Sequence, residues 1–155
     1  MARILKPPAP ITLADNEATV FLAGSIEMGR AENWQTVVEQ AFADSSITIL
    51  NPRRDEWDSS WEQSITNPQF CGQVEWELEA QERASLIAMY FAPGTQAPIT
   101  LLELGLFARS AKLVVCCPPG FWRRGNVEVV CARYGVPLVA SLEELLRGVR
   151  ERLMG

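Results

Sequence analysis

Five short apolar runs, each followed by a segment with helical spacing, constrain most strongly what this chain can fold into. Each run is apolar at nearly every position, which is typical of strands buried on both faces of a parallel sheet. The runs are residues 18–23, 47–50, 86–91, 112–117 and 137–140. The segments with helical spacing are residues 33–43, 68–83, 99–110, 126–134 and 141–153.

This alternation predicts an α/β fold in which right-handed crossovers place helices on both faces of a five-stranded parallel sheet. We expect the flavodoxin-like order 2-1-3-4-5 in a single domain that spans residues 1–155. A ligand would then bind beyond the ends of the first and third strands, near residues 24–30 and 91–99. The proline-containing residues 1–17 are expected to form an extended, loosely packed N-terminal arm.

The charge balance disfavours a general nucleic-acid binder. Lys and Arg number 14 against 19 Asp and Glu, which gives a net charge of −5 and no electropositive face for phosphates. No run of ~18 apolar residues suggests a membrane span, and residues 1–10 lack the apolar stretch of a signal peptide. We therefore expect a cytoplasmic protein without a nucleic-acid or membrane partner.

Histidine is absent, which excludes Ser-His-Asp catalysis and imidazole metal sites. The four cysteines contain no C-x-x-C pair, and Cys116 and Cys117 lie in an apolar run. They are interpreted as reduced core residues rather than metal ligands or disulfides. Neither a metal nor a cofactor is expected, since no G-x-G-x-x-G or P-loop motif is present.

Glu103 is the only charged residue between Arg83 and Arg109. A carboxylate on so apolar a helix must be paired, protonated or placed to do chemistry, because burying it unpaired is expensive. Either it acts as a catalytic carboxylate, or it is a surface glutamate or one bonded to a backbone amide.

Three loops carry candidate binding residues. Gly24-Ser25 forms a turn whose amides and hydroxyl suit a ligand's oxygens, or a plain strand-to-helix turn. The segment 53–58 combines guanidinium, carboxylate and indole groups that suit a nucleobase, or a salt-bridged loop. The loop 121–126 suits contact with a ligand or another subunit.

Taken in order, the segments FLAGSIEMG (21–29), NPRRDEWD (51–58), LIAMYF (86–91) and PITLLELGLFA (98–108) resemble the nucleoside 2-deoxyribosyltransferase family. The most specific part of the resemblance is Glu103-Leu104-Gly105, a carboxylate followed by a glycine expected to allow close packing.

The resemblance implies transfer of a 2-deoxyribosyl group between purine, and also pyrimidine, bases. Glu103 matches the family's nucleophile, which forms a covalent deoxyribosyl intermediate without metal or cofactor. By the same matching, Gly24 and Ser25 line the pocket, whereas Arg53, Asp55 and Trp57 hold the base. Family members are homo-oligomers, dimers or hexamers, with sites shared between subunits. Asn126 matches the position that reaches a neighbour's sugar.

Two positions depart from the family pattern. Ser85 and Ala97 stand where many members carry aspartates near the base and the sugar. Other groups must then protonate the base and bind the sugar. The candidates are Asp55, Glu77, Thr95 and Gln96.

Two alternative functions remain open at this stage. The first is an N-glycosidase of nucleoside 5'-monophosphates, with Ser25, Arg30 or a neighbour's Arg123 at the phosphate. The second is a non-catalytic nucleotide-binding module, in which Glu103 is structural.

Overall fold

The computed structural model describes residues 1–24, 33–54 and 59–154. In this part of the chain, strands and helices alternate almost throughout. In chain order the elements are β1 (Arg3–Leu5), β2 (Thr19–Gly24), α1 (Trp34–Ala41), β3 (Thr48–Leu50), α2 (Pro68–Arg83), β4 (Leu86–Tyr90), α3 (Pro98–Phe107), β5 (Leu113–Cys116), α4 (Arg124–Tyr134), β6 (Leu138–Val139) and α5 (Leu142–Met154).

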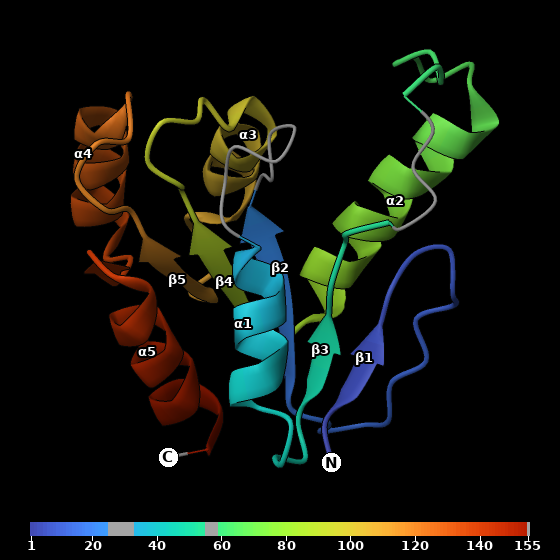
Figure 1. The fold of residues 1–155 in the computed structure, drawn as a ribbon, viewed down its shortest axis with the longest axis horizontal. Helices are drawn as coiled ribbons and strands as arrows, with labels where there is room; N and C mark the ends of the chain where they lie inside the picture. The colour runs from blue at the N-terminus through green and yellow to red at the C-terminus, as the bar shows by residue number, and fades with distance from the viewer. Residues whose placement is uncertain (25–32, 55–58, 155) are drawn as a thin grey trace.

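The strands form one parallel sheet in the order β1-β3-β2-β4-β5-β6. Helices α2, α3 and α4 cover one face, and α1 and α5 cover the other (Figure 1). The α/β class and the parallel sheet between two helical layers are therefore confirmed. The predicted number of five strands is wrong, because β1 adds a sixth outside the expected order.

The N-terminal arm is not loosely packed. β1 pairs with β3, with Arg3 opposite Thr48 and Leu5 opposite Leu50. The chain after β1 is held to α2, because Trp76 donates its indole N–H to the Ala9 carbonyl at 2.8 Å. A strand of three residues, followed closely by Pro7 and Pro8, has too little periodicity to be recognised in a sequence. It becomes regular only by pairing with a neighbour.

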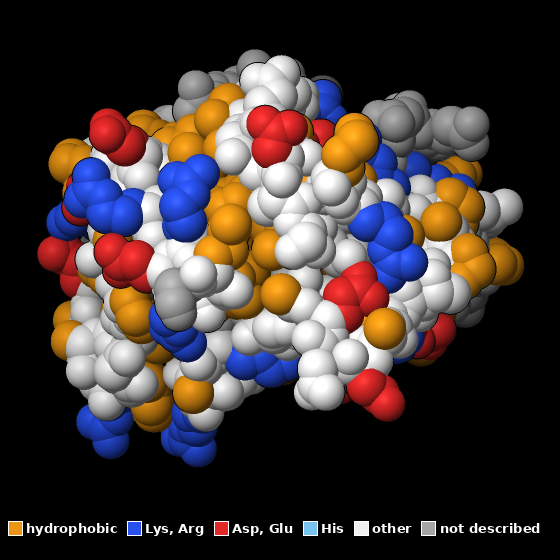
Figure 2. Space-filling view, turned by 90° about the horizontal axis from the view of Figure 1, so that it is seen from below, with side chains coloured by type: hydrophobic (Ala, Val, Ile, Leu, Met, Phe, Trp, Pro, Cys, Tyr) orange, Lys and Arg blue, Asp and Glu red, His pale blue; other side chains and the backbone are white. Residues whose placement is uncertain are grey.

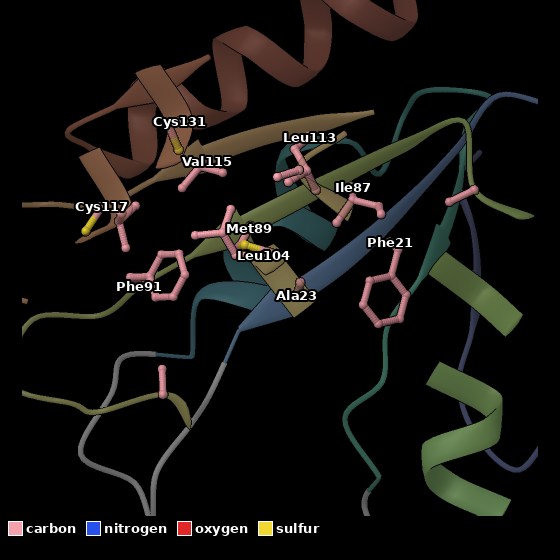
Figure 3. Packing of buried hydrophobic residues seen from close by; sticks show 14 of the residues in the cluster. Phe21, Ala23, Ile87, Met89, Phe91, Leu104, Leu113, Val115, Cys117 and Cys131 are labelled. Atoms are coloured by element: carbon pink, nitrogen blue, oxygen red, sulfur yellow. The ribbon is translucent and has the colours of Figure 1, made fainter. Parts of the chain in front are cut away.

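A hydrophobic core lies on each face of the sheet. The first joins Phe21 and Ala23 of β2, and Met89 of β4, to Leu104 of α3 (Figure 3). The second packs Trp34 and Val38 of α1 against the opposite face. All four cysteines are free, and Cys116, Cys117 and Cys131 are buried. The expected core position is thus confirmed for these three cysteines, whereas Cys71 is only partly buried.

The molecular surface mixes charges of both signs on the side where the strands begin (Figure 2). Basic and acidic side chains are interspersed there with apolar ones. Among the helices of the described residues, none is long and apolar enough to cross a bilayer.

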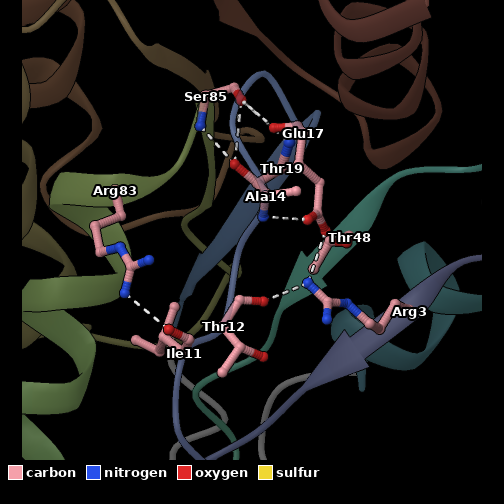
Figure 4. Close-up of polar contacts among 9 residues, drawn as sticks. All are labelled: Arg3, Ile11, Thr12, Ala14, Glu17, Thr19, Thr48, Arg83 and Ser85. Carbon is pink, nitrogen blue, oxygen red and sulfur yellow. Dashed lines mark hydrogen bonds and ion pairs between the residues drawn. The ribbon is translucent and has the colours of Figure 1, made fainter.

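Glu17 connects the N-terminal arm to the first residue of β3, Thr48 (Figure 4). Its carboxylate accepts hydrogen bonds from the Thr48 hydroxyl, from the Ala14 amide at 2.9 Å and from Arg3 at 2.8 Å. The Thr48 and Ala14 bonds, together with the charge of Arg3, hold the pKa of Glu17 below its ordinary value of 4.5. The arm and β3 are thus joined through one ionised side chain.

We predict that Glu17→Gln lowers the free energy of unfolding at pH 7. A carboxyl whose pKa is depressed in the folded state stabilises it above the unfolded pKa, and this contribution is lost on acidification. The difference between wild type and variant should therefore shrink from pH 7 to pH 3 in urea unfolding. Glu151→Gln, at an exposed position of α5, is the control. An equal difference at both pH values would contradict this role.

Candidate active site

Glu103 occupies the middle of α3 and is almost entirely buried. The helix begins directly after the loop that follows β4, with Pro98 in its first turn, where the missing N–H costs nothing. Only 6% of Glu103 is exposed, whereas Ile99 and Leu102 on the same helix are each 60% exposed. The helix therefore turns the Glu103 carboxylate inward and the aliphatic side chains of Ile99 and Leu102 outward. The interpretation of Glu103 as a surface glutamate is wrong.

A chain of hydrogen bonds connects Glu103 to α2 and to the loop after β3. The Gln81 amide donates to Glu103 Oε2 at 2.8 Å and to the Glu77 carbonyl at 3.0 Å. About two turns before Gln81, the Gln73 amide donates to Glu77 Oε2 and to the Pro52 carbonyl, both at 2.9 Å. Helix α2, helix α3 and the loop after β3 thus meet at the carboxyls of Glu103, which is buried, and Glu77, which is half-buried.

The two glutamines were not among the residues predicted for the site. With Glu77 they occupy every fourth position of α2, which puts Gln73, Glu77 and Gln81 on one side of the helix. We call these three residues the α2 polar stripe. The spacing of these residues in the sequence indicates that they share one face of a helix. It does not indicate that the face is buried, because glutamine is common on solvated faces.

The environment raises the pKa of both carboxyls. Burial, reinforced by the negative charge of Glu77, raises the pKa of Glu103 to about 8, although the bond from Gln81 opposes the shift. Burial raises the pKa of Glu77 to about 6 against the bond from Gln73. The charge of Glu77 thus links the protonation of Glu103 to that of Glu77. Near neutral pH the pair holds about one proton, so it can supply both an ionised carboxylate and a proton donor.

Gly24 ends β2 against the indole ring of Trp34. A Cβ at this position would lie 2.6 Å from Cζ2 of Trp34, whose ring is fully buried and also contacts Tyr90. Among the described residues the indole Nε1 of Trp34 has no acceptor. Gly24 is therefore required for close packing at the C-terminal end of β2. Ser25, predicted beside it, lies outside the described residues.

The segment after β3 is only partly described. The Arg53 amide donates to Asn51 Oδ1 at 3.0 Å, and the Arg54 guanidinium lies 4.9 Å from the centroid of the Trp61 ring. In the part of the chain that is described, the buried atoms Arg53 Nη1 and Arg54 Nε have no hydrogen-bond partner. Asp55 and Trp57, predicted to hold the base, fall outside that part, as does Arg30.

The loop between β4 and α3 holds two further candidates. Thr95 is buried and donates its hydroxyl to the Ala92 carbonyl at 2.8 Å. The Gln96 carbonyl accepts the indole N–H of Trp122 at 3.0 Å, and the Arg123 guanidinium lies 4.5 Å from the centroid of that indole ring. The predicted loop 121–126 therefore packs on the loop that leads into α3.

Asn126 and Gly105 are both exposed, and the predicted contact of Asn126 with a neighbour's sugar stays a prediction. Asn126 is exposed in the first turn of α4, and it takes no part in the described contacts of Glu103. Gly105 was expected to allow close packing, but nothing lies within 4 Å of a Cβ added there. It is exposed because the helix turns Glu103 and Leu104 inward instead.

Within residues 1–24, 33–54 and 59–154, no group of three or more His, Cys, Asp or Glu side chains is placed to hold a metal ion.

Substitutions of the two glycines should have opposite effects. We predict that Gly24→Ala lowers the free energy of unfolding by about 1–3 kcal/mol, because the added methyl overlaps a buried ring. Gly105→Ala, the matched control, should leave stability unchanged or raise it by up to about 1 kcal/mol through helix propensity. Chemical denaturation of both variants measures the difference. Equal stability of the two would contradict the packing described at Gly24.

Comparison with known proteins agrees with this arrangement. The crystal structure of a conserved protein from Enterococcus faecalis V583 has the same fold, with a TM-score of 0.58 and 13% identity, over 88% of this chain and 99% of that one. No curated protein sequence matches the chain. The profile of a family described as "Nucleoside 2-deoxyribosyltransferase like" matches residues 17–121, which include β2, the α2 polar stripe and Glu103. The chain belongs to this nucleoside 2-deoxyribosyltransferase-like family.

Proposed function

We propose that the protein transfers a 2-deoxyribosyl group from one nucleobase to another through a covalent intermediate on Glu103. The observation that carries the proposal is the buried Glu103 with a second carboxyl, Glu77, close enough to raise its pKa. Two carboxyls that share about one proton match the needs of glycosyl transfer with retention, in which one attacks and the other donates a proton. Family membership supports the same chemistry.

In the first half-reaction, a carboxylate oxygen of Glu103 attacks C1' of a 2'-deoxynucleoside. The C1'–N bond breaks, its electron pair stays on the base nitrogen, and Glu77 gives its proton to the departing base. The pKa values of about 8 for Glu103 and about 6 for Glu77 put the proton on Glu103 before the reaction, so it must move to Glu77 before Glu103 attacks. Positive charge developing at C1' favours this distribution, because it stabilises the ionised form of the nearer carboxylate.

In the second half-reaction, an incoming base replaces the first. The base gives a proton to the Glu77 carboxylate, its nitrogen attacks C1', and Glu103 leaves as a carboxylate. Exclusion of water is essential here, because water would hydrolyse the ester. The 6% exposure of Glu103 favours transfer over hydrolysis.

A homo-oligomer, a dimer or a hexamer, belongs to the same proposal. Helix α3 exposes Ile99, Leu102 and Leu106, which are 60%, 60% and 55% accessible and lie on one side of the helix. Exposed aliphatic residues in such a row favour contact with another subunit. Asn126 of a neighbouring subunit would then bind the sugar, as the family resemblance implies.

Chromatography of 2'-deoxyinosine incubated with the protein, with and without adenine, tests the proposed activity. We expect deoxyadenosine to form, and Glu103→Gln to lower its rate of formation by on the order of a thousandfold or more. The variant should unfold at no lower temperature, since it removes a carboxyl whose burial is unfavourable.

A parallel incubation with 2'-deoxyinosine 5'-monophosphate distinguishes the alternatives. Release of base from 2'-deoxyinosine 5'-monophosphate without exchange would favour the N-glycosidase. Absence of any reaction would favour a nucleotide-binding module. Full activity of Glu103→Gln would exclude a covalent role for this residue.

The proton donor can be tested with a base that leaves without protonation. We predict that Glu77→Gln slows transfer from 2'-deoxyinosine by about 10²–10⁴-fold, the usual value for general acid catalysis. Transfer from 7-methyl-2'-deoxyinosine, whose base already carries a positive charge, should change by only a few fold. Equal losses on the two substrates would show that Glu77 does not donate the proton.

A further inference from the structure

Gln81 is the one side chain in the described network that touches the Glu103 carboxylate directly. It is completely buried near the C-terminal end of α2, at the end of the α2 polar stripe. The position of its backbone is fixed as well. Lys112 donates to the carbonyls of Gln81 and Glu82, at 3.0 and 2.7 Å, and so binds the last turn of the helix.

The hydrogen bonds of Gln81 determine which way its amide points. Nε2 faces the Glu77 carbonyl as well as Glu103 Oε2. A backbone carbonyl can only accept a hydrogen bond, so a flipped amide would place two acceptors against each other. Gln81 must therefore present an N–H to Glu103. Such a donor favours the ionised form of the carboxyl.

The same amide is poorly suited to a purely structural role. Gln81 Oε1 is buried without a partner among the described residues. A buried acceptor left unpaired costs free energy, and an apolar side chain of the same shape would avoid this cost. A buried glutamine with an unpaired amide oxygen is explained if its N–H makes a hydrogen bond to Glu103 that no apolar side chain could make.

We infer that Gln81 is a positioning residue, which holds Oε2 of Glu103 so that Oε1 faces the reacting carbon as the attacking oxygen. The inference rests on the proposed function of Glu103. Of the described titratable groups, Glu77 is the one whose charge acts on Glu103. The strands beneath contribute apolar side chains such as Phe21, Ala23 and Ile87, which lie in the same core cluster as Leu104. Among the described residues, Gln81 is the side chain that donates to this carboxylate.

Gln81→Met tests this role, because it keeps the length of the side chain and removes the donor. Carboxyl ¹³C NMR titration, with Glu103 assigned through Glu103→Gln, should show a higher pKa for Glu103 in the variant. In transfer assays kcat should fall about ten- to hundredfold at pH 6 with KM nearly unchanged, and the loss should shrink toward pH 9 as Glu103 ionises.

A buried glutamine on the other face of the sheet provides the matched control. Gln35 of α1 is also buried with an unpartnered Oε1, so Gln35→Met should leave the titration and the pH profile unchanged. If Gln81→Met does not fold, Gln81→Asn replaces it, since its amide is one methylene too short to reach Glu103.

The outcomes separate this inference from the proposed function. An unchanged pKa of Glu103 in the Gln81 variant would overturn the inference, whatever the activity. So would a loss of kcat that is the same at every pH. If wild type transfers no base at all, the proposed function fails, and the NMR titration still decides whether Gln81 sets the ionisation of Glu103.

Discussion

The removal of one carboxylate from water is the constraint on which the arrangement of this protein depends. Glu103 is buried between a parallel sheet and helix α2, in surroundings that disfavour its charge. A buried charge persists only where donors are placed to meet it. The α2 polar stripe meets this need, and it does so at some expense to the fold, because the acceptor oxygens of Gln73 and Gln81 stay unpartnered among the described residues. Helix α3, which carries Glu103, instead exposes the aliphatic side chains of Ile99, Leu102 and Leu106 to solvent.

Much of the fold follows from the sequence. Strands buried on both faces appear as continuous apolar runs, so the core strands of the sheet could be recognised from Ala18 to Ala140. β1 could not, because three residues between a charged terminus and a pair of prolines have no pattern of their own. Pairing with β3 and the bonds of Glu17 make this segment regular. These are contacts over long sequence separations, which periodicity does not report.

A site residue could be predicted where its polarity differs from that of its neighbours in the sequence, and not where its polarity is the same as theirs. Glu103 could be singled out because a lone carboxylate in an apolar helix conflicts with its neighbours. Gln73 and Gln81 resemble ordinary surface residues, and their role emerges only when α2 is placed against α3. Gly105 shows the converse, since a motif suggested close packing and the helix orientation leaves it exposed. The roles predicted for Ser25, Asp55 and Trp57 stay predictions, because these residues lie outside the described part of the chain.

The two outermost strands have a consequence for how this protein meets other molecules. β1 has three residues and is soon followed by Pro7 and Pro8, whereas β6 has two residues and is preceded by Pro137. Sheet edges associate through unpaired backbone groups, and proline removes a donor from such an edge. Both borders of this sheet are therefore poor templates for a foreign strand. In the oligomer proposed above, contacts between copies would therefore be made by side chains on the surfaces of helices rather than by backbone pairing of strands.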